Sequence, residues 1–264
     1  MRTAGRAAII VTALIAVACA SGPRRPPAGG LNPDRFLFER GTEALKERRW
    51  LTAREYFREL IDTYPQSPHR AEAKLGLADS YLGEGTAESK VLAINEYREF
   101  LTFFPTHPRA DYAQFQLAMV HFSQMLSPQR DQTETKEAIR ELELFIQRYP
   151  NSSLLGEARQ KLREAKDRLG QHDYEVGLYY YRIRWYPGAI DRFRELLERD
   201  PEFTYRDAVY FHLAESLVRI NRAAEALPYY ERILKEFVKS EYLDEARRRI
   251  AELKGNKDAA KKPG

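Results

Sequence analysis

The chain has one cysteine, Cys19, and no apolar run long enough to cross a bilayer. A single cysteine excludes an internal disulfide and the paired-cysteine spacing of structural zinc sites. The longest mainly apolar stretch, residues 7–18, holds twelve residues, whereas a membrane-spanning helix needs about 20. We therefore expect neither a disulfide-stabilised domain nor a transmembrane protein.

The sequence also lacks the short motifs that carry common enzyme chemistry, including HExxH, the P-loop, GxSxG and the dinucleotide fingerprint. Its five histidines are scattered without a ligand-like spacing. His121 and His212 fall inside predicted helices, where we expect packing or surface roles rather than metal binding. We predict no enzymatic activity, no metal and no bound cofactor.

Neither sign of charge predominates, since the chain has 43 basic and 39 acidic residues. Acids and bases alternate along predicted helices, as in Glu55, Arg58 and Glu59, which indicates solvated helix faces rather than a nucleic-acid surface. Val and Thr are sparse, while the helix formers Ala, Leu, Glu, Arg and Lys dominate. The composition predicts an all-α protein with no nucleic-acid partner.

The first 18 residues have the form of an export signal. Two basic residues, Arg2 and Arg6, precede the apolar stretch, and Cys19 follows it. The small and aliphatic residues 15–18 resemble the lipobox of bacterial lipoproteins, with Ala16 in place of the usual leucine. We predict a lipoprotein signal peptide over 1–18 and a covalent lipid on Cys19; the alternative is an ordinary secretory signal with Cys19 as a free thiol.

Lipidation would give the lone cysteine a role, because several acyl chains anchor a protein stably where one chain does not. Residues 19–33, rich in Pro and Gly, are predicted to form a flexible tether. Ala20, which follows the cysteine where an acidic residue is absent, resembles the outer-membrane class of lipoproteins. We expect the chain on the periplasmic face of the outer membrane.

The rest of the chain repeats one phrase, in which a small residue is followed at fixed steps by alanine, an aromatic residue or leucine, and proline. Four of five copies keep the twelve-residue step from alanine to proline, and Val238 replaces the proline in the fifth. The first and fourth copies have tetratricopeptide spacing: Gly41, Ala53, Phe57 and Pro65, then Gly177, Ala189, Phe193 and Pro201. Such repeats build a solenoid of stacked helical hairpins.

We predict a tetratricopeptide-repeat solenoid of about five hairpins in two sub-arrays joined by a long helix. Repeats one to three occupy 34–151, and repeats four and five occupy 173–253. Between them, 152–172 has a single apolar stripe with three- and four-residue steps, which indicates one amphipathic linking helix. The basic tail, 254–264, lacks apolar periodicity and is predicted to be disordered.

The first helices of the hairpins should line an inner face. The residues expected there are apolar and often aromatic, as suits the binding of an extended peptide. Some of them would instead pack between repeats. The peptide-groove candidates are Phe38, Leu75, Phe115, Met119 and Phe122.

Two further segments are candidate sites. Arg130, Asp131, Gln132 and Thr133 lie in the long turn of the third repeat, where Asp131 with Glu134 fits a helix cap and a direct binding role is the alternative. Residues 179–192 combine aromatic residues and arginines, the types enriched at protein interfaces. Their partner-docking candidates are Arg182, Arg184, Trp185 and Arg192.

Four stretches, at 104–113, 130–135, 145–152 and 179–192, make the chain resemble the BamD family, lipoproteins of the outer-membrane β-barrel assembly (BAM) machinery. The resemblance implies a scaffold whose C-terminal repeats dock on POTRA domains of the barrel-forming subunit. It implies that the N-terminal repeats meet unfolded outer-membrane proteins, with other assembly lipoproteins as further partners, and that Arg192 is a docking residue. The alternative is a repeat scaffold for pilus assembly or for Tol-Pal and cell-envelope maintenance.

Overall fold

The computed structural model describes the backbone of residues 32–260 and the side chains of residues 32–255. The predicted signal peptide, Cys19, residues 20–31 of the predicted tether and the end of the basic tail, 261–264, lie outside the described residues. Within these bounds the chain forms eleven α-helices and no strand. They are α1 (Pro33–Lys46), α2 (Trp50–Thr63), α3 (Arg70–Glu84), α4 (Ala87–Phe103), α5 (Ala110–Phe122), α6 (Thr133–Arg148), α7 (Leu155–Arg182), α8 (Tyr186–Arg199), α9 (Arg206–Arg219), α10 (Ala223–Glu236) and α11 (Leu243–Ala260).

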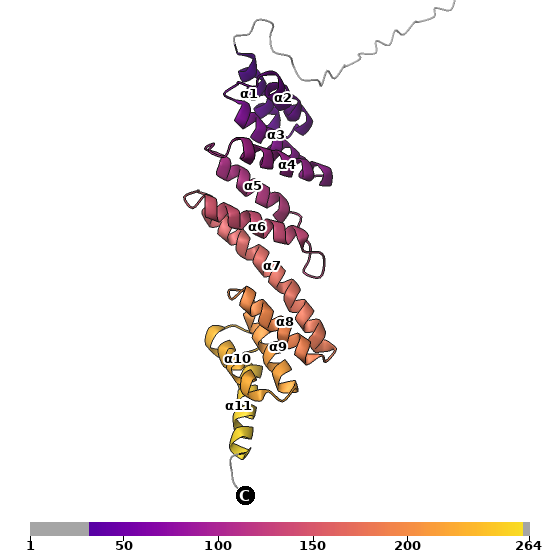
Figure 1. Ribbon diagram of the computed structural model, residues 1–264, viewed down its shortest axis with the longest axis vertical. Coiled ribbons are helices and arrows are strands. Elements are labelled where there is room, and N and C mark those ends of the chain that lie inside the picture. The colour runs from indigo at the N-terminus through magenta and orange to yellow at the C-terminus, as the bar shows by residue number, and fades with distance from the viewer. Residues whose placement is uncertain (1–31, 261–264) are drawn as a thin grey trace, which may run out of the picture.

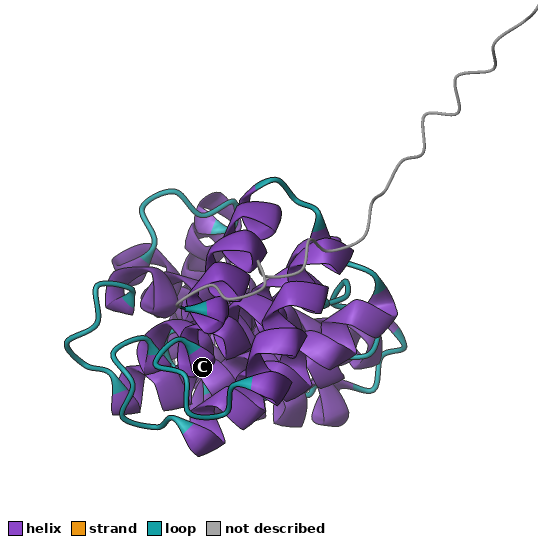
Figure 2. Cartoon of the chain, turned by 90° about the horizontal axis from the view of Figure 1, so that it is seen from above, coloured by secondary structure: helices purple, strands orange, loops and turns teal. Residues whose placement is uncertain are grey.

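The helices pair into five hairpins, α1/α2 to α9/α10, and each hairpin packs on the next. Figure 1 shows them stacked along the long axis of the molecule, with α1 near one end and α11 at the other. Seen along the stack in Figure 2, helices fill the centre and the connecting loops run around the outside. The predicted all-α solenoid of five hairpins is confirmed, and α11 is an additional helix that packs on α10.

Glycines let neighbouring hairpins approach across a shared aromatic ring. A Cβ built on Gly41 of α1 would lie 2.6 Å from the Phe57 ring, and one on Gly76 of α3 would lie 2.5 Å from the same ring. Phe57 therefore fills the space between two hairpins, and it is only 1% exposed. In the fourth hairpin, Phe193 takes the equivalent place beside Gly177.

The second helix of every hairpin ends two residues before the fixed proline position. In the first four hairpins the residue before proline is held out of the helical region by the pyrrolidine ring. In the fifth hairpin Val238 stands at this position, yet α10 still ends at Glu236 and Phe237 is extended (φ −127°, ψ 99°). The last hairpin thus keeps the geometry of the others without the proline.

The boundary that the sequence places at 172/173 lies inside one continuous helix. α7 runs for 28 residues, from Leu155 to Arg182, so the predicted linking helix and the first helix of the fourth repeat are the same element. Its first half packs Ala158 against α5 and α6, while Gly170 and Gly177 in its second half contact Phe203 and Phe193. Small residues recur along both halves and let neighbouring helices approach, so stacking continues across the predicted division.

The predicted start of the disordered tail, Lys254, also lies inside a helix, because α11 continues to Ala260. Propagating an existing helix by one residue adds one hydrogen bond at little cost, so a helix runs past the residues that pack it. Upstream, Ala246 is fully buried, and Ile250 and Leu253 pack on the core of α7–α11. α11 therefore covers the apolar end of the array.

Among the described residues, no helix is both long enough and apolar enough to span a membrane.

Candidate partner-binding surfaces

The turn between α7 and α8 exposes apolar and basic side chains together. Tyr179, Ile183 and Trp185 are 59%, 53% and 53% exposed, and Arg182 and Arg184 beside them are exposed as well. We call these five residues the turn surface. The structure therefore brings together three of the four predicted docking residues on one connection.

Local geometry holds the turn surface in place. Arg184 adopts a left-handed conformation (φ 63°), which lets the Trp185 amide donate to the Tyr180 carbonyl at 2.9 Å. The Trp185 ring meets the Tyr180 ring edge-on at 4.8 Å. A Cβ on Gly188 would lie 2.7 Å from the indole, so only glycine leaves room for this ring. Trp185 is thus exposed on one face and packed on the other.

The same turn in the first hairpin presents a different chemistry. Arg48 has the same left-handed conformation (φ 58°) as Arg184. When the two turns are aligned on these arginines, each residue of the turn surface has a counterpart in the first hairpin. Glu43, Lys46, Glu47 and Arg49 stand in place of Tyr179, Arg182, Ile183 and Trp185. One backbone turn therefore carries charged residues in the first hairpin and exposed apolar residues in the fourth.

Large exposed aromatic residues beside arginines are typical of the energetic centre of a protein interface. Tyr179 and Ile183 lie in the predicted segment 179–192 but are not among its docking candidates. An alignment of the first repeat with the fourth identifies them, because each replaces a glutamate at a position that faces solvent in both hairpins. The turn surface is therefore a part of the described chain whose composition fits a docking site.

Arg192, the fourth predicted docking residue, lies on α8 apart from the turn itself. Its Nη1 donates to Glu195 Oε2 at 3.0 Å, and both side chains are about half exposed. With Asp173 and Val176 of α7, Arg192 lines a shallow hollow of about 200 Å³. An exposed pair of this kind contributes little to stability, which leaves the guanidinium free to change partners.

The predicted peptide groove is only partly present. Leu75 and Phe115 are 0% and 4% exposed and belong to the core, so the packing alternative holds for them. Met119 is half-buried against the Phe115 cluster. A continuous apolar groove along the N-terminal repeats is therefore wrong, because the first helix of a hairpin buries apolar residues against hairpins on both sides.

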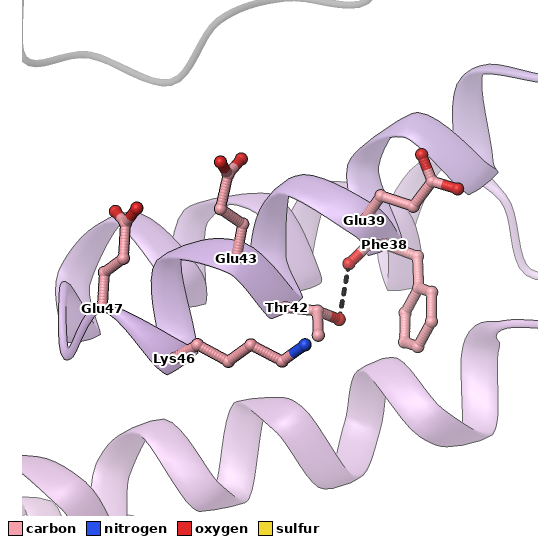
Figure 3. A pocket seen from close by; sticks show the side chains of 6 residues that line it. All are labelled: Phe38, Glu39, Thr42, Glu43, Lys46 and Glu47. Carbon is pink, nitrogen blue, oxygen red and sulfur yellow. Dashed lines mark hydrogen bonds between the residues drawn. The ribbon is translucent and has the colours of Figure 1, made fainter.

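Phe38 and Phe122 remain accessible. Phe38 lines a hollow of about 390 Å³ on α1 and stacks on His69 at 4.8 Å. Figure 3 shows Phe38 extending to one side of α1, with Glu43 and Glu47 pointing to the other, and the Thr42 hydroxyl donating to the Phe38 carbonyl at 2.8 Å. The other residues around this hollow are charged or polar, although its accessible surface is mainly apolar.

Phe122 lines a second hollow, of about 380 Å³, together with Met125 and residues of α7. Lys161 Nζ lies 4.8 Å from the centre of its ring, a cation–π contact. This surface mixes aromatic and charged groups.

The predicted motif loop is built around Gln132, which is 5% exposed. Its side-chain amide donates to the carbonyls of Ser127 and Arg130, at 2.8 and 3.0 Å, and its oxygen accepts from the Thr135 hydroxyl at 2.8 Å. Gln132 therefore closes the long turn before α6. Arg130, Asp131 and Thr133 are exposed around it.

The helix cap expected from Asp131 and Glu134 forms only in part. Asp131 Oδ1 accepts from the Thr133 amide at 2.9 Å, and this bond lowers the pKa of its carboxyl. Glu134 does not return toward the loop but bonds His121 Nδ1 at 2.7 Å. The prediction of a cap in which Glu134 also takes part is therefore wrong, because His121 of α5 binds the Glu134 carboxylate instead.

The same loop is tied to the middle of α7. Arg168 donates to the Leu126 carbonyl at 2.8 Å, and His172 Nδ1 lies 2.6 Å from the Pro128 carbonyl. These contacts join the third hairpin to the helix that begins the fourth. The loop thus has a structural role, and its exposed residues Arg130 and Asp131 carry any binding role.

Comparison with known proteins decides the family. The model of the YfiO family, described as an outer membrane lipoprotein, matches residues 32–217. The chain belongs to the YfiO family. A tetratricopeptide-repeat model also matches residues 208–240 of this YfiO-family chain, over α9 and α10.

Several relatives carry the name outer membrane protein assembly factor BamD. That of Caulobacter vibrioides is 30% identical over 229 residues, covering 84% of this chain and 73% of the relative. That of Vibrio cholerae is 26% identical over 194 residues, covering 70% of this chain and 78% of the relative. The resemblance drawn from the sequence motifs is thereby confirmed.

Among solved structures, the TPR2AB domain of yeast Sti1 in complex with pHSP90 is similar at 14% identity and a TM-score of 0.46, covering 85% of this chain and 84% of that one.

Proposed function

We propose that this chain is an outer membrane protein assembly factor, a scaffold of the BAM complex that acts by binding and positioning. The observation that carries the proposal is the similarity to assembly factors over 84% of the chain. A solenoid suits this role, since stacked hairpins expose an extended surface at fixed spacing. No covalent step is needed, and we assign none to the chain.

The turn surface is the proposed docking site for POTRA domains of the barrel-forming subunit. Trp185 and Tyr179 offer large contact areas with few rotatable bonds, and the arginines offer charge-assisted hydrogen bonds. Arg192 extends the site along α8. The accessible rings at Phe38 and Phe122 are the proposed contacts for unfolded outer-membrane proteins, and other assembly lipoproteins are further proposed partners.

Binding to purified POTRA domains tests the docking site. Trp185→Ala should weaken binding at least about tenfold, because exposed tryptophans in interfaces dominate affinity. Arg192→Glu should also weaken it by reversing the charge. Arg49→Ala is the matched control, since Arg49 occupies the Trp185 position in the first hairpin, and it should leave affinity unchanged. Equal affinities for all three folded variants would refute the assignment.

A lipid on Cys19 would hold the scaffold on the periplasmic face of the outer membrane. The support is the lipobox-like sequence before Cys19 together with membership of an outer membrane lipoprotein family. Mass spectrometry of the mature protein should find an acylated N-terminal cysteine. An unmodified Cys19 would contradict this anchor.

A pull-down from envelope extract separates assembly of β-barrels from the alternative scaffold roles. Recovery of the barrel-forming subunit supports the proposal. Recovery of pilus, Tol-Pal or peptidoglycan-associated proteins without that subunit would overturn it.

A further inference from the structure

His121 sits at the end of α5 with 6% of its side chain exposed. Its Nδ1 lies 2.7 Å from Glu134 Oε2 on α6. An ionised carboxylate accepts but cannot donate, so Nδ1 carries a proton, and in the neutral imidazole the lone pair is then on Nε2. The Glu134 contact therefore fixes both the ring orientation and the tautomer.

The other ring nitrogen, Nε2, is buried and has no hydrogen-bond partner among the described residues. A buried acceptor without a partner destabilises the fold, because its hydrogen bond to water is lost and not replaced. Most buried polar atoms in proteins are satisfied, so an exception points to a group that completes the site.

Two carboxylates supply the rest of such a site. Glu137 and Glu141 follow Glu134 on α6 at steps of three and four residues, which puts all three on one helix face. One oxygen of each and a ring nitrogen of His121 all lie within 4.8 Å of one another. Glu141 is 3% exposed, so the cluster is not a chance group of surface acids.

We propose that His121 Nε2, Glu137 and Glu141 form a binding site for a divalent first-row transition-metal ion, with Zn²⁺ as the best fit. One imidazole with two carboxylates, and a fourth position left to water, suits the tetrahedral preference of zinc. Zn–N and Zn–O bonds of about 2.0–2.2 Å put ligand atoms roughly 3.5 Å apart. Side-chain adjustments on the order of 1 Å bring these three groups to that spacing.

Surrounding contacts are those that a metal site needs. A ligating histidine usually donates its other nitrogen to a carboxylate, as His121 does to Glu134. The Gln114 amide, 1% exposed, donates to Glu141 Oε2 at 2.7 Å and orients that carboxylate. The site therefore has oriented ligands before any ion binds.

Arg98 and Arg140 compete for these carboxylates. Arg98 Nη2 lies 3.9 Å from Glu141 Oε1, and Arg140 is the closer competitor. Its Nη2 donates to Glu137 Oε2 at 2.6 Å and to Glu141 Oε1 at 2.7 Å, and the side chain is 56% exposed. The exposed guanidinium can swing into solvent when an ion enters.

A bound ion would join α5 to α6 beside the loop that contacts α7. His121 and Glu134 stand at the two ends of that loop. The ion would therefore stabilise the pairing of α5 with α6 next to that loop.

Calorimetric titration of the full chain in detergent with Zn²⁺ alone tests the proposal. We expect one ion per chain and a higher thermal unfolding midpoint with Zn²⁺. His121→Gln and Glu137→Gln should each weaken binding at least about tenfold, and Glu134→Gln should weaken it about 10–100-fold. Arg140→Gln should strengthen it severalfold by removing the closer competitor.

Matched controls separate this site from other zinc-binding groups. Glu143→Gln changes a glutamate of the same helix that pairs with Lys166, and His107→Gln changes a histidine that lies beside Glu72. Both should bind Zn²⁺ as the parent chain does. If His121→Gln fails to fold, Glu137→Gln decides the matter, since its side chain is 36% exposed. No one-to-one binding, or binding unchanged in Glu137→Gln, would overturn the proposal.

Discussion

The contact between Gly177 and Phe193 offers the sharpest test of how the hairpins are held together. A Cβ at Gly177 would lie 2.5 and 2.7 Å from two atoms of the Phe193 ring, whereas ordinary contacts begin near 3.4 Å. Phe193 is fully buried, so its ring has no solvent into which it can move. Gly177→Ala must therefore displace the ring, and with it α8, by about 1 Å.

The expected cost follows from two opposing effects. Overpacking a well-filled core costs about 1–3 kcal/mol, and alanine in place of glycine inside a helix returns up to about 1 kcal/mol. We expect Gly177→Ala to lower the free energy of unfolding by about 1–2 kcal/mol. For a chain of this size the melting temperature should fall by roughly 2–4 °C per kcal/mol.

Gly156 is the control on the same helix. A Cβ there meets nothing within 4 Å, so Gly156→Ala keeps only the gain in helix propensity and should stabilise the chain by up to about 1 kcal/mol. Thermal and denaturant unfolding, followed by circular dichroism, measure both variants. Equal changes at the two glycines, or a Gly177→Ala variant more stable than the parent, would refute the view that the Phe193 ring needs a glycine opposite it.

Four other variants test separate contacts. Arg48→Gly and Arg184→Gly should each stabilise the fold by about 1 kcal/mol, because glycine adopts positive φ freely, but only Arg184→Gly should weaken POTRA binding in a direct titration. Gln132→Ala should cost about 1–3 kcal/mol by leaving buried loop groups unpaired, and faster amide hydrogen exchange in residues 123–132 should reveal it. Burial raises the pKa of Asp79 above its ordinary 3.8 despite two tyrosine hydrogen bonds. The parent chain therefore loses stability as pH rises from 3.8 through the folded-state pKa of Asp79. The stability of Asp79→Asn relative to the parent should increase over that pH range and then level off. A stability difference that stays constant from pH 3 to 7 would contradict this.

Much of the fold could be predicted from the sequence because the determinants are local and repeated. Helix-forming composition, the fixed step from alanine to proline, and glycines opposite aromatic residues each act within one hairpin or between neighbours. Even Val238, where the proline is missing, leaves α10 ending at the expected residue. The family could also be predicted, since the motif strings that carry it lie in these same hairpins.

The candidate sites were harder to predict from sequence, because exposure depends on what packs outside each hairpin. Leu75 and Phe38 hold similar positions on the first helix of their hairpins. Leu75 lies between two hairpins and is buried, whereas Phe38 lies on α1, where one side of the helix is not covered by another hairpin. The continuity of α7 was also hard to predict. Its first half packs on the third hairpin and its second half belongs to the fourth, so the contacts of both halves decide where one repeat ends and the next begins.

By itself, the sequence determined the helices, their pairing and the family, because backbone propensity and short-range spacing are written along the chain. Only the tertiary structure decided which side chains meet across helices. Glu134, Glu137 and Glu141 share a helix face, but their neighbour His121 comes from α5, and the length of the loop between the helices sets that pairing. Likewise, Phe115 and Phe38 are both aromatic residues of first helices, and packing buries the first and leaves the second accessible.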